Sequence, residues 1–156
     1  MKRMMLTVLL SGAALAGLSA CDRSGDAPPR ATQPGAPVPA PQRLNDPTVL
    51  ARGRALFEQN CAVCHGGNAQ GAVNWRVRSP DGTFPPPPLN GTGHAWHHPK
   101  QWLHQMIKYG SPPGQGHMPA WDTRLSDDDI DATIAWFQSQ WPDAVYQAWA
   151  EMQRGQ

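Results

Sequence analysis

Two cysteines and a histidine stand together near the middle of the chain, in the order Cys61-Ala62-Val63-Cys64-His65. This C-x-x-C-H spacing is typical of covalent haem attachment. Both thiols can add across the vinyl groups of one haem, and the imidazole beside them can coordinate the iron. The pattern predicts one covalently bound haem c, attached through Cys61 and Cys64, with His65 as an axial iron ligand.

The C-x-x-C spacing alone is also found in zinc sites and in redox dithiols. A zinc site needs two further ligands in a matching pair, and Cys21, the one cysteine outside the motif, has a different predicted role at the N-terminus. A redox dithiol is expected in a βαβ setting, and no strand pattern persists in this sequence. We therefore favour haem attachment.

A thioether is the expected second iron ligand. Met118 follows a glycine-bearing loop at 110–116, precedes Pro119 and lies between two predicted helices, so that it can fold over the far face of a haem. Met106 lies on an apolar helical stripe, which favours a place in the core. Histidines would instead give a haem with two imidazole ligands, and the candidates are His94, His97, His98, His104 and His117.

Helices and long loops are expected to position these residues. Seventeen prolines and fifteen glycines in 156 residues leave little room for uninterrupted secondary structure. Apolar residues at three- and four-residue spacing, together with capping residues, predict helices only. The expected elements are a helix that begins at Asp46-Pro47 and runs into Cys61, a helix from Pro99 to Gly110, a helix that begins at Ser126 with a pattern similar to a capping box, and a short terminal helix after Trp141-Pro142.

Further motifs stand around the haem-attachment segment. They are Gly53, Leu56 and Phe57 before it, Pro87-Pro88-Leu89-Asn90-Gly91 and Met118-Pro119 after it, and an aromatic-rich helix near the C-terminus. In this order, residues 44 to about 141 resemble a class I cytochrome c. The resemblance implies an all-α fold in which three core helices and long loops wrap around one haem, with a short extra C-terminal helix.

The resemblance also implies two specific contacts. The N- and C-terminal core helices would cross closely over Gly53, against either Trp136 or the face that carries Ile134 and Phe137. A glycine within a helix otherwise costs about 1 kcal/mol relative to alanine, so close packing explains its presence.

The second contact concerns the imidazole beneath the iron. A proline backbone carbonyl would accept the Nδ1 proton of His65, and the pattern assigns this role to Pro87, with Pro88 as the alternative. Such a bond fixes the ring and tunes its basicity.

Two segments depart from the pattern of the family: an insertion at 74–84 and the cluster His94-Ala95-Trp96-His97-His98. The four prolines that follow the insertion predict a stiff loop that covers a haem edge. The histidine cluster could bind copper or zinc, but no carboxylate or thiol lies beside it. We therefore favour a structural role, in which His98 caps the helix that begins at Pro99, and His94 and His97 lie on the surface or bond the haem propionates.

The N-terminus resembles a bacterial lipoprotein signal. Lys2 and Arg3 precede an apolar stretch that is short for a membrane span, and the stretch ends in Leu18-Ser19-Ala20-Cys21. We expect a signal peptide at 1–20, a lipidated Cys21 within a Pro-rich tether at 21–43, and a cytochrome domain at 44–156. The protein would then be anchored on the periplasmic side of a membrane. Asp22 suggests the inner membrane.

Charge is divided along the sequence. Residues 44–121 carry six Lys or Arg against three Asp or Glu, whereas residues 122–156 carry two against seven. The domain is therefore expected to be dipolar, which disfavours nucleic acid binding and allows weak, transient docking to redox proteins. We expect a monomer.

Together these features predict a single-electron carrier. Ligation by His65 and Met118 would leave no iron position open for a substrate, so an enzyme is not expected. The alternatives are a haem enzyme or gas-binding protein with a labile distal ligand, and a copper-handling or sensing module that uses the His94–His98 cluster.

Overall fold

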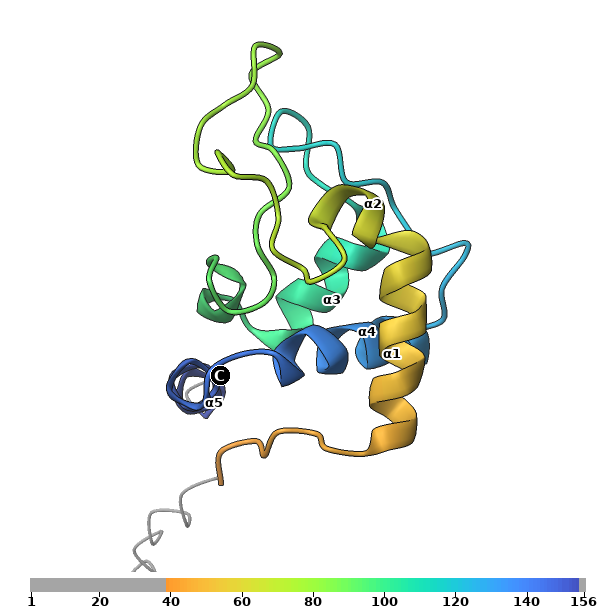
Figure 1. Cartoon of the computed structure of the whole chain (residues 1–156), viewed down its shortest axis with the longest axis vertical. Coiled ribbons are helices and arrows are strands. Elements are labelled where there is room, and N and C mark those ends of the chain that lie inside the picture. The colour runs from red at the N-terminus through yellow and green to blue at the C-terminus, as the bar shows by residue number, and fades with distance from the viewer. Residues whose placement is uncertain (1–38, 155–156) are drawn as a thin grey trace, which may run out of the picture. The chain divides into compact units, whose positions relative to one another are not determined.

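The computed structural model describes residues 39–154 of the 156-residue chain. Its elements in chain order are α1 (Pro47–Asn60), α2 (Ala62–His65), the 3-10 helix η1 (Ala95–His97), α3 (Lys100–Tyr109), α4 (Asp127–Ser139) and α5 (Asp143–Gln153) (Figure 1). Residues 39–154 contain no strand, which confirms the all-α prediction. Among these residues, no helix has both the length and the apolar character needed to cross a membrane. The predicted signal peptide, Cys21 and most of the tether lie outside the described residues.

Helix α1 begins where the sequence predicts. The Asp46 carboxylate accepts hydrogen bonds from the backbone amides of Thr48 and Val49, and Pro47 occupies the first turn, where its missing N–H costs nothing. The helix buries Gly53 and Phe57 on one face. Because these residues are four positions apart, they lie above one another and face the same neighbour.

That neighbour is α4, which α1 crosses (Figure 1). A Cβ atom at Gly53 would lie 2.6 Å from the backbone carbonyl carbon of Ala132 and 2.9 Å from Cβ of Trp136. One turn further along α1, the ring of Phe57 packs on Trp136 with centroids 4.4 Å apart. The predicted contact with Trp136 is confirmed. The glycine does not meet the face of Ile134 and Phe137 but the backbone of Ala132.

Helix α4 begins with a capping box. The Ser126 hydroxyl accepts a hydrogen bond from the Asp129 amide, and the Asp129 carboxylate accepts one from the Ser126 amide. Arg52 of α1 also donates to Asp129. The beginning of α4 is thus tied to the crossing helix.

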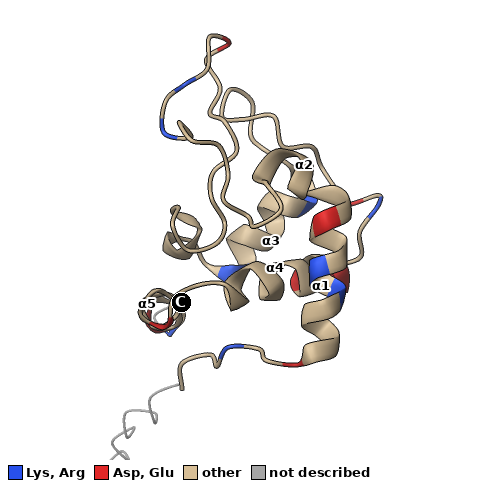
Figure 2. Ribbon diagram, viewed as in Figure 1, with Lys and Arg blue, Asp and Glu red and all other residues tan. Residues whose placement is uncertain are grey.

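The charge division of the sequence is partly offset where the helices meet. Bases of α1 and α3 pair with acids of α4, and Figure 2 shows the two colours side by side where α1 crosses α4. The pairs are Arg52 with Asp129 at 2.6 Å, Lys108 with Asp127 at 2.7 Å and Lys100 with Asp131 at 2.8 Å. Exposed pairs of this kind contribute little to stability, because water and salt screen them. The expected dipole is therefore smaller than the sequence indicates.

Two buried tryptophans attach the C-terminal part of the chain to the loops. The indole N–H of Trp141 donates to the Leu89 carbonyl at 2.7 Å, and that of Trp149, on α5, donates to the His98 carbonyl at 3.0 Å. The predicted capping of α3 by His98 is wrong: Pro99 is the N-cap residue and provides no side-chain hydrogen bond. A side chain of α5 takes that role instead, because Gln153 accepts from the Lys100 amide at 3.1 Å.

Candidate haem site

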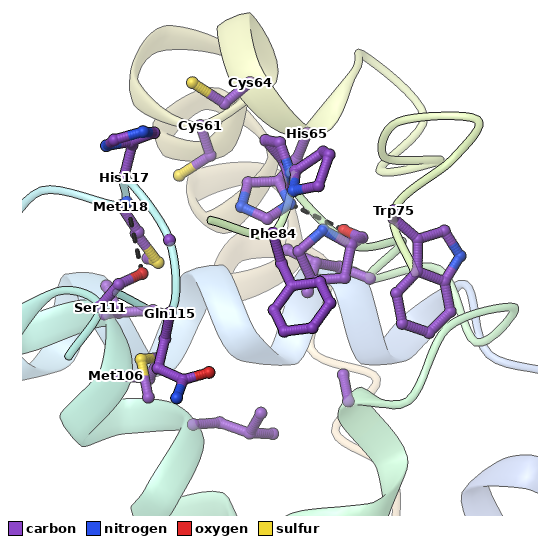
Figure 3. Close-up of a pocket in the computed structure, with 18 of the residues that line it drawn as sticks. Cys61, Cys64, His65, Trp75, Phe84, Met106, Ser111, Gln115, His117 and Met118 are labelled. Carbon is purple, nitrogen blue, oxygen red and sulfur yellow. Dashed lines mark hydrogen bonds between the residues drawn. The ribbon is translucent and has the colours of Figure 1, made fainter. Parts of the chain in front are cut away.

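One large pocket lies between α2, α3 and the loops that connect the helices. Its volume is about 1170 Å³, and its walls are mostly apolar. Cys61, Cys64, His65, Pro87 and Met118 all line it, although 57 positions separate the first from the last. Figure 3 labels the two cysteines, His65 and Met118 and shows how these four side chains lie.

The two cysteines are placed by a helix that stops and restarts. Cys61 is the C-cap residue of α1, and α2 carries Cys64 and His65 in a single turn. Cys61 is half-buried and Cys64 is exposed. Burial, followed by the neighbouring Cys64, raises the pKa of the Cys61 thiol to about 11.

His65 is buried, with only 8% of its surface exposed. Its Nδ1 lies 2.9 Å from the Pro87 carbonyl oxygen. A carbonyl can only accept, so Nδ1 carries the proton and Nε2 keeps its lone pair. Burial lowers the pKa of His65, and the bond to Pro87 offsets this in part. The imidazole is therefore neutral and oriented, as a metal ligand must be.

The carbonyl of Pro87 is held in place by the loop that follows His65. The Ala72 amide donates to the Pro86 carbonyl at 2.9 Å, and the Leu89 amide donates to the Ala69 carbonyl at 2.8 Å. Gly71 has a φ of +67°, and a Cβ atom there would lie 2.5 Å from the carbonyl carbon of Pro87. Only glycine fits this turn. The proline run and the segment after the haem-attachment motif thus position each other.

Met118 lies on the opposite side of the pocket from His65 (Figure 3). Its amide donates to the Ser111 hydroxyl at 3.3 Å, and its carbonyl accepts from the Ser111 amide at 3.0 Å. These bonds close the loop 111–118 at its two ends. Met106, on α3, lines the same pocket and offers a second thioether.

The histidine cluster divides into two parts. His94 and His98 line the pocket, whereas His97 stacks on Trp96 with ring centroids 3.7 Å apart. His98 stacks on Trp102, also at 3.7 Å. Burial is the main cause that lowers the pKa values of His94 and His98. In the part of the chain that the structure describes, no group of three His, Cys, Asp or Glu side chains could hold a metal ion.

The sequence did not reveal part of the pocket wall. Trp75, Arg76 and Phe84 of the insertion line it, as do Ser111 and Gln115 of the loop before Met118. Two large aromatic residues within an otherwise polar insertion are the signal that could have indicated a buried role.

The residues that line the pocket fit a covalently attached haem. The mostly apolar walls suit a macrocycle, the two thiols stand beside the imidazole, and a thioether lies across from it. Residues 48–137 match the family described as "Cytochrome C oxidase, cbb3-type, subunit III". The chain is a class I c-type cytochrome of this family.

Curated relatives of two kinds match this cytochrome. It is 36% identical over 91 residues to the Cbb3-type cytochrome c oxidase subunit CcoP of Azospirillum brasilense, a match that covers 57% of this chain and 28% of that subunit. It is 32% identical over 96 residues to cytochrome c6 of Chlorolobion braunii, which covers 58% of this chain and 90% of that protein. This cytochrome thus spans about a quarter of the length of the CcoP relative. No solved structure is significantly similar to it.

Proposed function

We propose that this cytochrome carries single electrons through one covalently bound haem. The observation that supports the proposal is the arrangement of His65 and Met118 on opposite sides of one apolar pocket, beside Cys61 and Cys64. A haem c supplies an iron that accepts and releases one electron. With a side chain on each axial position, no site remains for a substrate, which favours electron transfer over an enzymatic reaction.

In this proposal each residue of the site has a separate role. Cys61 and Cys64 form the thioether links, and His65 binds iron through Nε2. The Pro87 carbonyl oxygen, 2.9 Å from Nδ1, accepts the hydrogen bond from this nitrogen and so fixes the ring. Met118 is the sixth ligand, and its soft sulfur raises the reduction potential.

Visible spectra of the oxidised and reduced haem-loaded protein test this assignment. We expect the weak long-wavelength band of Met-ligated Fe(III) in the oxidised protein and no CO binding by the reduced protein. A spectrum with two imidazole ligands, or rapid CO binding, would contradict it. The second result would favour a haem enzyme or gas-binding protein.

We further propose that the partners are redox proteins that dock weakly and transiently to a monomer. The CcoP relative and the FixP relative from Rhizobium meliloti (strain 1021) are named as cytochrome c oxidase subunits. These names support a place in or beside an oxidase. The cytochrome c6 relatives, which have nearly the size of this domain, support a separate carrier.

The proposed organisation is a signal peptide at 1–20, a lipidated Cys21 with its tether at 21–43, and the haem domain at 44–156. Lipidation would hold the domain on the periplasmic side of a membrane, and Asp22 suggests the inner membrane. Cys21→Ser should release the protein into the soluble fraction with its spectrum unchanged, because only the anchor is lost. Cell fractionation measures this. Retention in membranes would mean that the N-terminal segment is an uncleaved anchor.

A further inference from the structure

Two candidate iron ligands stand side by side on the distal loop 111–118. Met118 and His117 both line the haem pocket, and Figure 3 shows them on the same side of it. Imidazole binds iron well, and a histidine next to the intended ligand is a competitor for the same position. The fold therefore has to select between the two side chains.

The His117 imidazole is already bound elsewhere. Its Nε2–H donates to Oδ2 of Asp81 at 2.6 Å, although 36 positions separate the two residues. A charge-assisted bond of this length is strong for an exposed pair. Nε2 is an iron-binding atom of an imidazole, so a ring held by Asp81 in this way cannot offer it to the iron.

The Asp81 carboxylate is itself oriented. Its Oδ1 accepts from the Thr83 amide at 2.9 Å and from the Thr83 hydroxyl at 2.7 Å, and Thr83 is buried. Both donors occupy one oxygen, which leaves Oδ2 for His117. These bonds, led by the one from His117, hold the pKa of Asp81 below its usual range. The insertion at 74–84 thus presents a fixed anionic acceptor to the distal loop.

Other contacts join the insertion to the distal loop without His117. Arg78 donates to the Gly114 carbonyl at 3.0 Å, and the Phe84 amide donates to the Gln115 carbonyl at 3.1 Å. The Met118 backbone is bound to Ser111 at both its amide and its carbonyl. Loss of Asp81 would therefore free the imidazole while the loop and the thioether stay in place.

We propose that Asp81 selects the sixth iron ligand, because it holds the His117 imidazole and so leaves the iron to the Met118 thioether. Asp81 is a positioning residue, since it acts through His117 and touches neither haem ligand. The proposal rests on the proposed ligation by His65 and Met118. It gives the insertion, which departs from the pattern of the family, a role at the haem.

The test uses the full-length, haem-loaded protein and two variants, Asp81→Ala and the double variant Asp81→Ala with His117→Ala. In Asp81→Ala we expect His117 to displace Met118, so that the long-wavelength band is lost and the reduction potential falls. In the double variant both should return, because the competitor is gone. His117→Ala alone and the control Glu151→Ala, on α5, should resemble the wild type.

The outcomes separate this proposal from the one on which it rests. A wild type without the Met–Fe(III) band overturns the Met118 assignment and the selection by Asp81 together. A wild type with the band and an Asp81→Ala variant that keeps it overturn the role of Asp81 alone. Loss of the band in both the single and the double variant also overturns it, because the loop rather than the imidazole would then have moved. If Asp81→Ala does not mature, Asp81→Val carries the same test, since its side chain also offers His117 no hydrogen-bond partner.

Discussion

His65 shows how a single hydrogen bond can decide what a residue does. The imidazole has two nitrogens that could bind a metal, and the Pro87 carbonyl occupies one of them at 2.9 Å. Burial lowers the pKa of the ring, so that it is neutral at physiological pH. The remaining nitrogen, Nε2, is therefore available as an iron ligand at neutral pH.

Met118→Ala tests the opposite side of the haem. Both thioether links and the His65 bond should survive, because they lie on the other side of the pocket. The long-wavelength band should disappear, the potential should fall as sulfur is withdrawn, and the reduced protein should bind CO. The free energy of unfolding should fall by about 2 kcal/mol, the low end for truncating a methionine, because the side chain is only half-buried. Optical titration and urea unfolding measure these changes.

A control is needed because His117 can replace the lost sulfur. The double variant His117→Ala with Met118→Ala removes this substitute and should bind CO more readily than Met118→Ala alone. If the band and the potential persist in Met118→Ala, the ligand is another side chain. Met106, which lines the same pocket, would be the next to change.

At the scale of the elements, the crossing of α1 and α4 depends on Gly53. Alanine usually stabilises a helix interior relative to glycine by about 1 kcal/mol. Here the added methyl group would collide with the backbone of Ala132 and with Trp136. We expect Gly53→Ala to lower the free energy of unfolding by about 1–3 kcal/mol, the usual cost of overpacking.

Gly67→Ala is the matched control for this variant. Nothing lies within 4 Å of a Cβ atom at Gly67. We therefore expect the free energy of unfolding to change by less than about 0.5 kcal/mol. Urea unfolding of both haem-loaded variants gives the comparison. Equal stability of the two variants would mean that α1 and α4 are not as close as the structure has them.

The capping box of α4 predicts a dependence on pH. The Ser126 hydroxyl and amide, followed by Arg52, hold the pKa of Asp129 below its usual value. A carboxyl whose pKa is lower in the folded state stabilises the fold above the unfolded pKa of about 3.9, and this contribution is lost as the pH falls through the folded pKa. Stability should therefore decline on acidification below about pH 5, and less steeply in Asp129→Asn.

Asp128→Asn serves as the control, because Asp128 lies in the same turn and makes no side-chain hydrogen bond within residues 39–154. The free energy of unfolding of the Asp128→Asn variant should depend on pH in the same way as that of the wild type. The measurement is urea unfolding at a series of pH values from about 7 down to about 2, which starts where the carboxyl is fully charged and crosses the window below about pH 5 in which it becomes protonated. If the free energy of unfolding of Asp129→Asn falls with pH as steeply as that of the wild type, the charge of Asp129 contributes nothing to the stability of the fold.

At the scale of the whole domain, the haem pocket is a large internal space. A domain of this size has only a small hydrophobic core. The cavity of about 1170 Å³ between α2, α3 and the loops therefore has to be filled for the fold to be stable. The helices alone bury mainly the α1–α4 crossing and the aromatic residues beneath it. Folding and haem attachment are therefore expected to be coupled.

The double variant Cys61→Ala with Cys64→Ala tests this coupling. We expect complete loss of covalent haem together with loss of cooperative unfolding, because the walls of the pocket would have nothing to pack against. Haem staining after denaturing electrophoresis measures attachment, and far-ultraviolet circular dichroism with thermal unfolding measures the fold. A stable, helical variant without haem would contradict the coupling.

The sequence by itself determined the features that depend on residues close together along the chain, namely motifs and helix caps. The C-x-x-C-H motif indicated the chemistry, and Asp46-Pro47 and Ser126 with Asp129 marked the beginnings of two helices, because caps and motifs act over three or four positions. The order of the motifs was enough to indicate the family. These inferences need no knowledge of how the loops run.

Only the tertiary structure decided the contacts between distant residues that loops without a periodic pattern bring together. It showed that Gly53 meets Ala132, that Gln153 rather than His98 accepts from the start of α3, and that Trp75 and Phe84 line the pocket. The physical reason is the distance along the chain. Residues such as Asp81 and His117 meet only because proline- and glycine-rich loops fold back on each other, and neither propensity nor spacing encodes that path.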